Sequence, residues 1–204
     1  MELAIKLLAL FFAIVLHEVA HGYVAWKLGD PTARRAHRLT LNPLAHIDLV
    51  GSIVLPLTLL LVKSPVLFGW AKPVPFNPSY FRDPRRGIML VGAAGPMTNL
   101  SVAIVSALLY RLIGPAGGIF ALFTAFLAYL CITNIFLGVF NLIPIPPLDG
   151  SRILIGILPE ELVRPYLQLE RFGFLIIFGL LYLGALDRIV LPAAYFLLRL
   201  LMGE

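Results

Sequence analysis

The feature that most constrains this chain is a long stretch without charge. From Leu112 to Leu148 the sequence contains no Asp, Glu, Lys or Arg. A single helix of that length would measure about 55 Å, which is more than one bilayer crossing requires. Gly and Pro residues at 114–118 and at 144–147 interrupt the stretch, so it predicts a helix over about 119–140 and then extended chain. Such backbone at membrane depth must be buried in protein or line a wet cavity.

Composition supports a membrane protein. Hydrophobic residues make up 60% of the 204 residues and charged residues 13%, and there is one cysteine. Soluble domains average about 25% charged residues, so the sequence excludes a disordered chain, a disulfide scaffold and a coiled coil. The 16 Lys and Arg against 11 Asp and Glu indicate basic cytoplasmic loops rather than nucleic-acid binding. We expect the lipid bilayer as a partner and no nucleic acid.

The apolar segments predict an all-α polytopic membrane protein with about five to six transmembrane or partly re-entrant helices. Three segments are long enough to span the bilayer: Leu3 to about Trp26, Ile88–Tyr110 and about 119–140. Three others are shorter: 49–62, 172–186 and 189–198. Alternation at 36–41 predicts a small β element near residues 36–48. We expect one domain over 1–204, with a catalytic core at about 3–158 and C-terminal helices at about 165–201.

The basic loops bear on orientation. Residues 27–48 and 63–86 both carry an excess of Lys and Arg, although they flank the apolar segment 49–62. Segment 49–62 therefore dips into the membrane and returns, with both loops cytoplasmic, or it is a short true span that departs from the positive-inside rule. We favour the first alternative. With its several apolar segments, the chain is expected to be a multi-pass protein of the cell membrane.

The strongest chemical signal is the sequence HEVAH at residues 17–21. On a helix, His17 and His21 share a face, so both imidazoles can bind one metal ion. Glu18 lies beside them, placed to take a proton from a water on the metal. Two histidines and a carboxylate inside an apolar helix are costly unless functional. Zn²⁺ suits such a site, which still requires a third protein ligand.

Asp149 is the leading candidate for that third ligand. It ends the charge-free stretch, directly after the Pro-rich break. Gly150 follows it and lets the chain turn. An alternative is that Asp149 caps a helix that starts near Ser151, and the two roles are compatible.

Three motifs in this order resemble the site-2 protease family of intramembrane zinc metalloproteases. They are HExxH at 17–21, GPMTN at 95–99 and NLIPIPPLDG at 141–150. The resemblance implies one Zn²⁺ per chain held by His17, His21 and Asp149, with Glu18 as general base. It implies that Asn99 binds substrate or polarises the scissile carbonyl. The chain resembles a compact member without a PDZ or CBS domain.

Depth supports this arrangement. Measured from a cytoplasmic end near Trp26, His17 and His21 lie about 8–14 Å deep, and Gly95 and Asn99 lie about 10–17 Å deep from the start of their own helix. The small residues Gly92, Ala93, Ala94 and Gly95 would let the two helices approach closely, or serve packing alone. The active site is therefore expected nearer the cytoplasmic side.

The roles of three other residues are less determined. His46 could contact substrate or the zinc, or it could be a loop histidine bonded to backbone. Asn141 is expected to tie down the extended segment and so, with Gly150, to support Asp149.

The expected activity is hydrolysis of peptide bonds in or near transmembrane segments of membrane-protein substrates, by Glu-assisted attack of zinc-bound water. The alternative is a non-proteolytic zinc-binding membrane protein or a transporter that retains the fold. A transporter would be expected to show repeated halves, which the sequence lacks.

Overall fold

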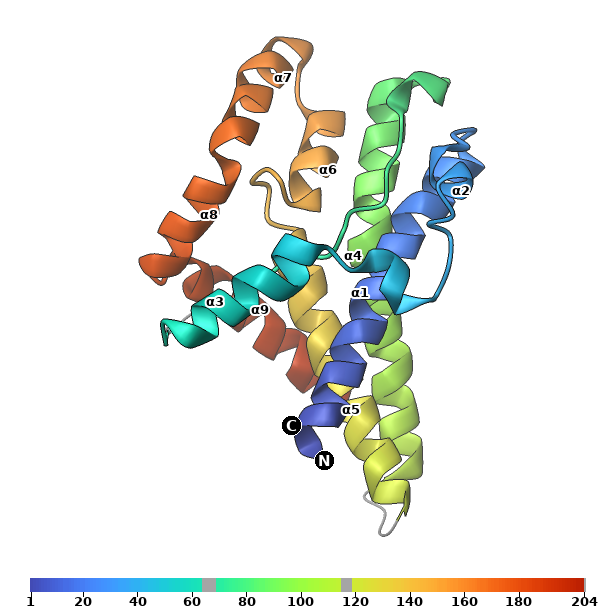
Figure 1. Cartoon of the computed structure of the whole chain (residues 1–204), viewed down its shortest axis with the longest axis vertical. Coiled ribbons are helices and arrows are strands. Elements are labelled where there is room, and N and C mark those ends of the chain that lie inside the picture. The colour runs from blue at the N-terminus through green and yellow to red at the C-terminus, as the bar shows by residue number, and fades with distance from the viewer. Residues whose placement is uncertain (64–68, 115–118, 204) are drawn as a thin grey trace.

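The computed structural model describes residues 1–63, 69–114 and 119–203 (Figure 1). Their secondary structure is helical, with no strand among the described residues. The α-helices are α1 (Glu2–Lys27), α2 (Thr32–Arg35), α3 (Leu55–Leu61), α4 (Pro84–Ile113), α5 (Ile119–Asn141), α6 (Asp149–Ile157), α7 (Glu160–Leu167), α8 (Gly173–Tyr182) and α9 (Ala185–Met202). Short 3₁₀ or π segments lie at Pro43–His46, Leu49–Val54, Pro78–Tyr80 and Gln168–Phe172.

Helices α1, α4 and α5 form the centre of the molecule. They contact one another along their lengths (Figure 1). By length and composition these three can cross a membrane, which confirms the three long helices predicted from the apolar segments. Helix α4 begins at Pro84, before the predicted start at Ile88, because the Asp83 side chain accepts a hydrogen bond from the backbone N–H of Arg86 and Pro84 follows the cap.

Small side chains line the contacts between these helices. Ala9 and Ala13 of α1 have no exposed surface, and Ala103 and Ala107 of α4 are buried against α5 and α9. Small residues let helix backbones approach closely in a membrane, where hydrophobic burial alone cannot drive association. The outward faces are apolar, with exposed side chains that suit contact with lipid, among them Leu7, Leu8, Phe11, Phe12, Ile104, Val105 and Leu108.

The segment between α1 and α4 returns to the end from which it starts. In Figure 1, α1 ends and α4 begins at the same end of the bundle. Helix α3 has seven residues, about 10 Å of helix, and it lies across the bundle rather than along it. The arginines of α2 and those at the start of α4 therefore lie toward the same end of the molecule. The choice between a re-entrant segment and a short span over 49–62 stays a prediction.

The small β element predicted near residues 36–48 is not confirmed. The backbone N–H groups of Ala36, His37 and Arg38 donate to carbonyls of α2, so they are not free to pair with a strand. The buried Arg38 side chain donates to the backbone carbonyls of Lys72 and Pro73. Alternation of residue types was thus a poor guide here, because local turns use the backbone donors first.

The C-terminal part differs from the prediction in two respects. Among the described residues the structure has three candidate spans, so a total of five to six spanning or re-entrant helices is not confirmed. Residues 142–148 form compact turns rather than extended chain: Ile145 N–H donates to the carbonyl of Ile143 (2.8 Å) and Leu148 N–H to that of Ile145 (2.9 Å). Helix α9 packs on α5 and α4, whereas α7 and α8 stand apart from α1 (Figure 1).

Candidate metal centre

The two histidines of the HExxH motif lie on the face of α1 that packs against α4. His17 and His21 are one helical turn apart, and both are buried, at 6% and 5% exposure. Their ring centroids are 4.6 Å apart. The helix period alone places them on one face, and the α1–α4 contact takes that face out of reach of lipid.

Each imidazole is oriented through its Nδ1 atom. Nδ1 of His17 lies 2.5 Å from Oδ1 of Asn99, and Nδ1 of His21 lies 2.6 Å from the carbonyl oxygen of Val91. Because both oxygens can only accept hydrogen bonds, both Nδ1 atoms must carry the proton. The two Nε2 atoms are left with lone pairs for a metal, which is the usual arrangement of metal-binding histidines.

Asp149, the first residue of α6, completes a triangle of ligand atoms. Its Oδ2 lies 3.0 Å from Nε2 of His17 and 3.1 Å from Nε2 of His21, and the two Nε2 atoms are 3.0 Å apart. Ligands at about 2.0–2.1 Å in a tetrahedral zinc site are about 3.3 Å from one another. The two histidines and Asp149, far apart in the sequence, therefore fit three corners of such a site.

The charge of Asp149 suits a cation. A carboxylate oxygen is an anionic ligand that zinc accepts. The second carboxylate oxygen, Oδ1, accepts a hydrogen bond from Nη1 of Arg152 at 3.1 Å. Arg152 was not predicted from the sequence, although its position three residues after Asp149 places both on one helical face.

Helix α4 comes close to this triangle because it has no side chain at Gly95. A Cβ atom there would lie 2.5 Å from Cε1 of His17 and 2.5 Å from Nε2 of His21. At Gly92, one turn earlier, a Cβ would lie 2.6 Å from the Cβ of Arg152. The predicted close approach is thus required at the metal centre itself.

Glu18 lies beside the triangle on α1 and is partly buried. Its Oε2 accepts a hydrogen bond of 2.8 Å from the backbone N–H of Val74. The segment after α3, which contains Val74, is therefore hydrogen-bonded to the predicted general base. No side-chain signal in the sequence could have indicated this contact, because Val74 makes it through its backbone.

Asn99 of α4 contacts the first histidine of the motif. It has no exposed surface, its Oδ1 faces His17, and its Nδ2 donates to Oδ1 of Asn134 (2.7 Å) and to the carbonyl of Ala13 (3.3 Å). In this structure Asn99 orients His17 through this hydrogen bond, and its contact with substrate stays a prediction. Asn134 was missed, although an amide within the uncharged helix α5 was a visible signal.

The remaining predicted residues lie outside the triangle. His46 is buried, and its Nε2 donates to the carbonyl of Thr40 at 2.9 Å, as the loop-histidine alternative supposed. Asn141 donates to the carbonyl of Leu137 in its own helix at 3.0 Å, so it does not tie down residues 142–148 through this bond.

Gly150 supports Asp149 for a reason other than the one predicted. It is helical, and a Cβ there would lie 2.2 Å from the carbonyl oxygen of Leu142 and 2.4 Å from that of Ile143. The absence of a side chain, not a turn conformation, lets residues 142–148 pack on the start of α6.

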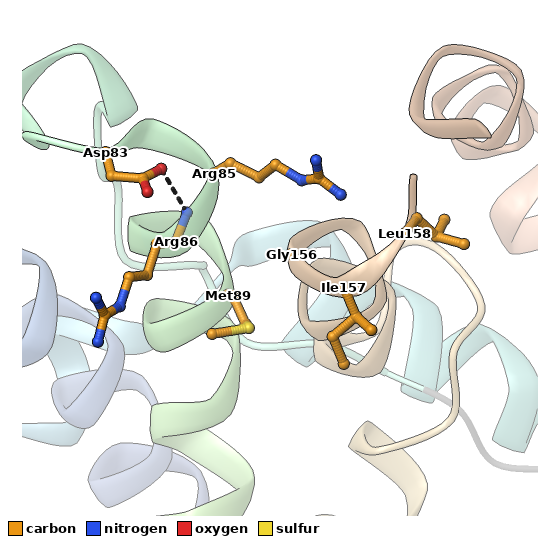
Figure 2. A pocket seen from close by; sticks show the side chains of 7 residues that line it. All are labelled: Asp83, Arg85, Arg86, Met89, Gly156, Ile157 and Leu158. Atoms are coloured by element: carbon orange, nitrogen blue, oxygen red, sulfur yellow. Dashed lines mark hydrogen bonds between the residues drawn. The ribbon is translucent and has the colours of Figure 1, made fainter. Parts of the chain in front are cut away.

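A separate hollow of about 480 Å³ lies between the first turns of α4 and the end of α6. Figure 2 shows its lining, where Arg85 points toward α6 and Met89 lies beside the turn that contains Gly156. None of the predicted site residues lines this hollow. Its lining residues are Asp83, Arg85, Arg86, Met89, Gly156, Ile157 and Leu158. The hollow is thus distinct from the metal centre.

Comparison with known proteins gives the class. The model of peptidase family M50 matches residues 116–183. The Bacillus subtilis (strain 168) protein named "Putative zinc metalloprotease YwhC" is 39% identical over 90% of this chain and 82% of its own length. Rip2 of Mycolicibacterium smegmatis, with the same designation, is 33% identical over 86% of this chain and 66% of its own length. No solved structure gives a significant match.

These similarities define a zinc metallopeptidase, and its apolar helices make it a membrane protein. The chain belongs to the site-2 protease family, peptidase family M50.

Proposed function

We propose that this chain hydrolyses peptide bonds in or near the transmembrane segments of membrane-protein substrates, and that it binds one zinc ion through His17, His21 and Asp149. The observation that carries the proposal is the convergence of these three buried side chains, two of them on α1, a helix long and apolar enough to cross a membrane. His17 and His21 lie about 15 Å and 9 Å along α1 from Lys27, so a substrate helix could be cut within the bilayer.

The chain's own residues divide the chemistry among them. A zinc ion in this site would polarise the scissile carbonyl and lower the pKa of water to about 7. Glu18 takes the proton of the attacking water on its second oxygen and returns it to the leaving amine. Asn99 and the Val91 carbonyl keep both Nδ1 atoms protonated, and Arg152 holds the second oxygen of Asp149.

The charge distribution supports a cytoplasmic position for this end of the molecule. The loops on both sides of the apolar segment 49–62 are basic and lie toward the end where α1 finishes. Cytoplasmic loops carry the excess of Lys and Arg in membrane proteins. The metal centre would then lie nearer the cytoplasmic side.

Glu18→Gln tests the mechanism. The amide keeps the shape of the side chain but cannot take a proton, so cleavage of a single-span test substrate should fall by about 10²–10⁴-fold. The zinc content of the purified protein should stay at one ion per chain, because Glu18 is not among the three ligands. Full cleavage by Glu18→Gln would refute the role of Glu18.

The same assay separates the alternative function. A wild-type chain that binds zinc but cleaves no test substrate in proteoliposomes would favour a non-proteolytic zinc-binding protein. His17→Ala serves as the control for zinc loss, since it removes a ligand and should lower both zinc content and cleavage.

A further inference from the structure

Asn134 is a buried amide on α5 that the proposed mechanism does not use. It has no exposed surface and lies in a helix without charged residues. Its Oδ1 accepts a 2.7 Å hydrogen bond from Nδ2 of Asn99, and its own Nδ2 donates to the carbonyl of Leu130 at 2.8 Å. Burying an amide without hydrogen-bond partners is unfavourable, so these bonds fix how the Asn134 side chain lies.

These bonds form a chain with one possible direction. The Leu130 carbonyl can only accept, so it takes the NH₂ group of Asn134 and leaves the Asn134 oxygen to face Asn99. That oxygen, together with the Ala13 carbonyl, takes the NH₂ group of Asn99. The Asn99 oxygen is then the atom that faces Nδ1 of His17.

The direction matters at the metal ligand. If the Asn99 amide were reversed, its NH₂ group would face Nδ1 of His17, which would have to accept. The ring proton would then sit on Nε2, the atom that points at Asp149, and a protonated Nε2 cannot bind a metal. The reversed amide would also set the Asn99 oxygen against the oxygens of Asn134 and Ala13.

We propose that Asn134 is a positioning residue that acts through Asn99 and ensures that His17 presents the lone pair of Nε2 to the metal. The inference rests on the proposed zinc site and adds a residue from a fourth helix, α5, to those that α1, α4 and α6 contribute. Helix α5 thereby contributes to metal binding without supplying a ligand.

The first test is the zinc dissociation constant of Asn134→Leu, measured on the purified full chain by competition with a chromophoric chelator. Leu has a similar shape but removes the oxygen, so Asn99 can reverse more easily. The dissociation constant should rise by about tenfold, at the lower end of the 10–100-fold effect of residues behind metal ligands. Thr124→Val is the matched control, because Thr124 is a buried polar residue of the same helix that bonds only to carbonyls of α5.

The second test separates positioning from packing. Asn99→Asp offers an oxygen to His17 whichever way it rotates, so Asn134 no longer selects a direction. In this background the Asn134 oxygen faces a carboxylate oxygen, and Asn134→Leu should leave zinc affinity unchanged or improve it. Asn134→Ala, measured in both backgrounds, replaces the Leu variant if that variant does not purify as a folded protein.

The outcomes are distinct. An equal loss of zinc affinity in both backgrounds, or no loss in folded Asn134→Leu, would overturn the positioning role while leaving the proposed protease intact. Failure of the wild-type chain to bind zinc would instead overturn the proposed function together with this inference. A loss of zinc affinity in the chain with native Asn99, but not in the Asn99→Asp chain, would support the positioning role.

Discussion

Gly95 sets how closely α4 can approach the two histidines of α1. A methyl group at this position would meet atoms of both imidazoles at 2.5 Å, a distance that Cβ atoms do not tolerate. The rings are also held by their Nδ1 partners, Asn99 and Val91, so they cannot move aside without losing those bonds. Among the glycines near the site, Gly95 therefore has the most direct effect on ligand geometry.

Gly95→Ala should raise the zinc dissociation constant at least tenfold, the scale of disturbances to residues that orient metal ligands. Zinc competition on the purified variant measures this. Gly179→Ala on α8 is the control, since nothing lies within 4 Å of a Cβ at that position. Unchanged affinity in Gly95→Ala would mean that the helices separate at little cost.

At the scale of elements, residues 71–77 form a crossing segment that links the loop after α1 to the catalytic face. The N–H of Lys72 donates to the carbonyl of His46, that of Val74 to Glu18, and that of Asn77 to the buried Asp30 at 2.6 Å. Phe76 of this segment lies under the guanidinium of Arg152 at 5.3 Å. The crossing segment thus contacts the predicted base on one side and the partner of Asp149 on the other.

Val74→Pro removes the single N–H that the crossing segment donates to Glu18. We expect kcat for a test substrate to fall about tenfold with zinc content unchanged, because Glu18 loses the bond that orients it and the ligands are untouched. Val74→Ala is the comparison, since it shortens the side chain but keeps the N–H. Equal activity of the two variants would show that this bond does not position Glu18.

At the scale of the whole molecule, we expect both basic loops to lie on one side of the membrane. Helices α1, α4 and α5 alternate in direction, and α1 ends at the same end of the bundle where α4 begins (Figure 1). Arg35 and Arg82 are exposed near one end of the bundle, and Leu112 is exposed near the other.

Single cysteines test this topology after Cys131, the one native cysteine, is replaced by Ser. A membrane-impermeant maleimide should label Arg35→Cys and Arg82→Cys in vesicles of one orientation, and Leu112→Cys in vesicles of the opposite orientation. Labelling of Arg35→Cys and Arg82→Cys from opposite sides would instead show that residues 49–62 cross the membrane.

Much of the fold followed from the sequence because the signals are local. Long apolar segments predicted α1, α4 and α5, since a bilayer admits few other structures. The pair His17 and His21 followed from the helix period. Predictions of backbone outside these helices did less well: residues 36–41 are turns rather than a strand, and residues 142–148 are compact rather than extended. Their backbone bonds depend on which neighbours are close in space.

What the sequence alone determined is a membrane-embedded helical chain and the residue types for one zinc site, because hydropathy and motif spacing report on single helices. What only the tertiary structure decided is how those residues act. Asn99 bonds to Nδ1 of His17, Glu18 accepts a hydrogen bond from the backbone of Val74, and Arg152 and Asn134 join the site. Hydrogen bonds between residues dozens of positions apart depend on helix packing, and no local pattern encodes them.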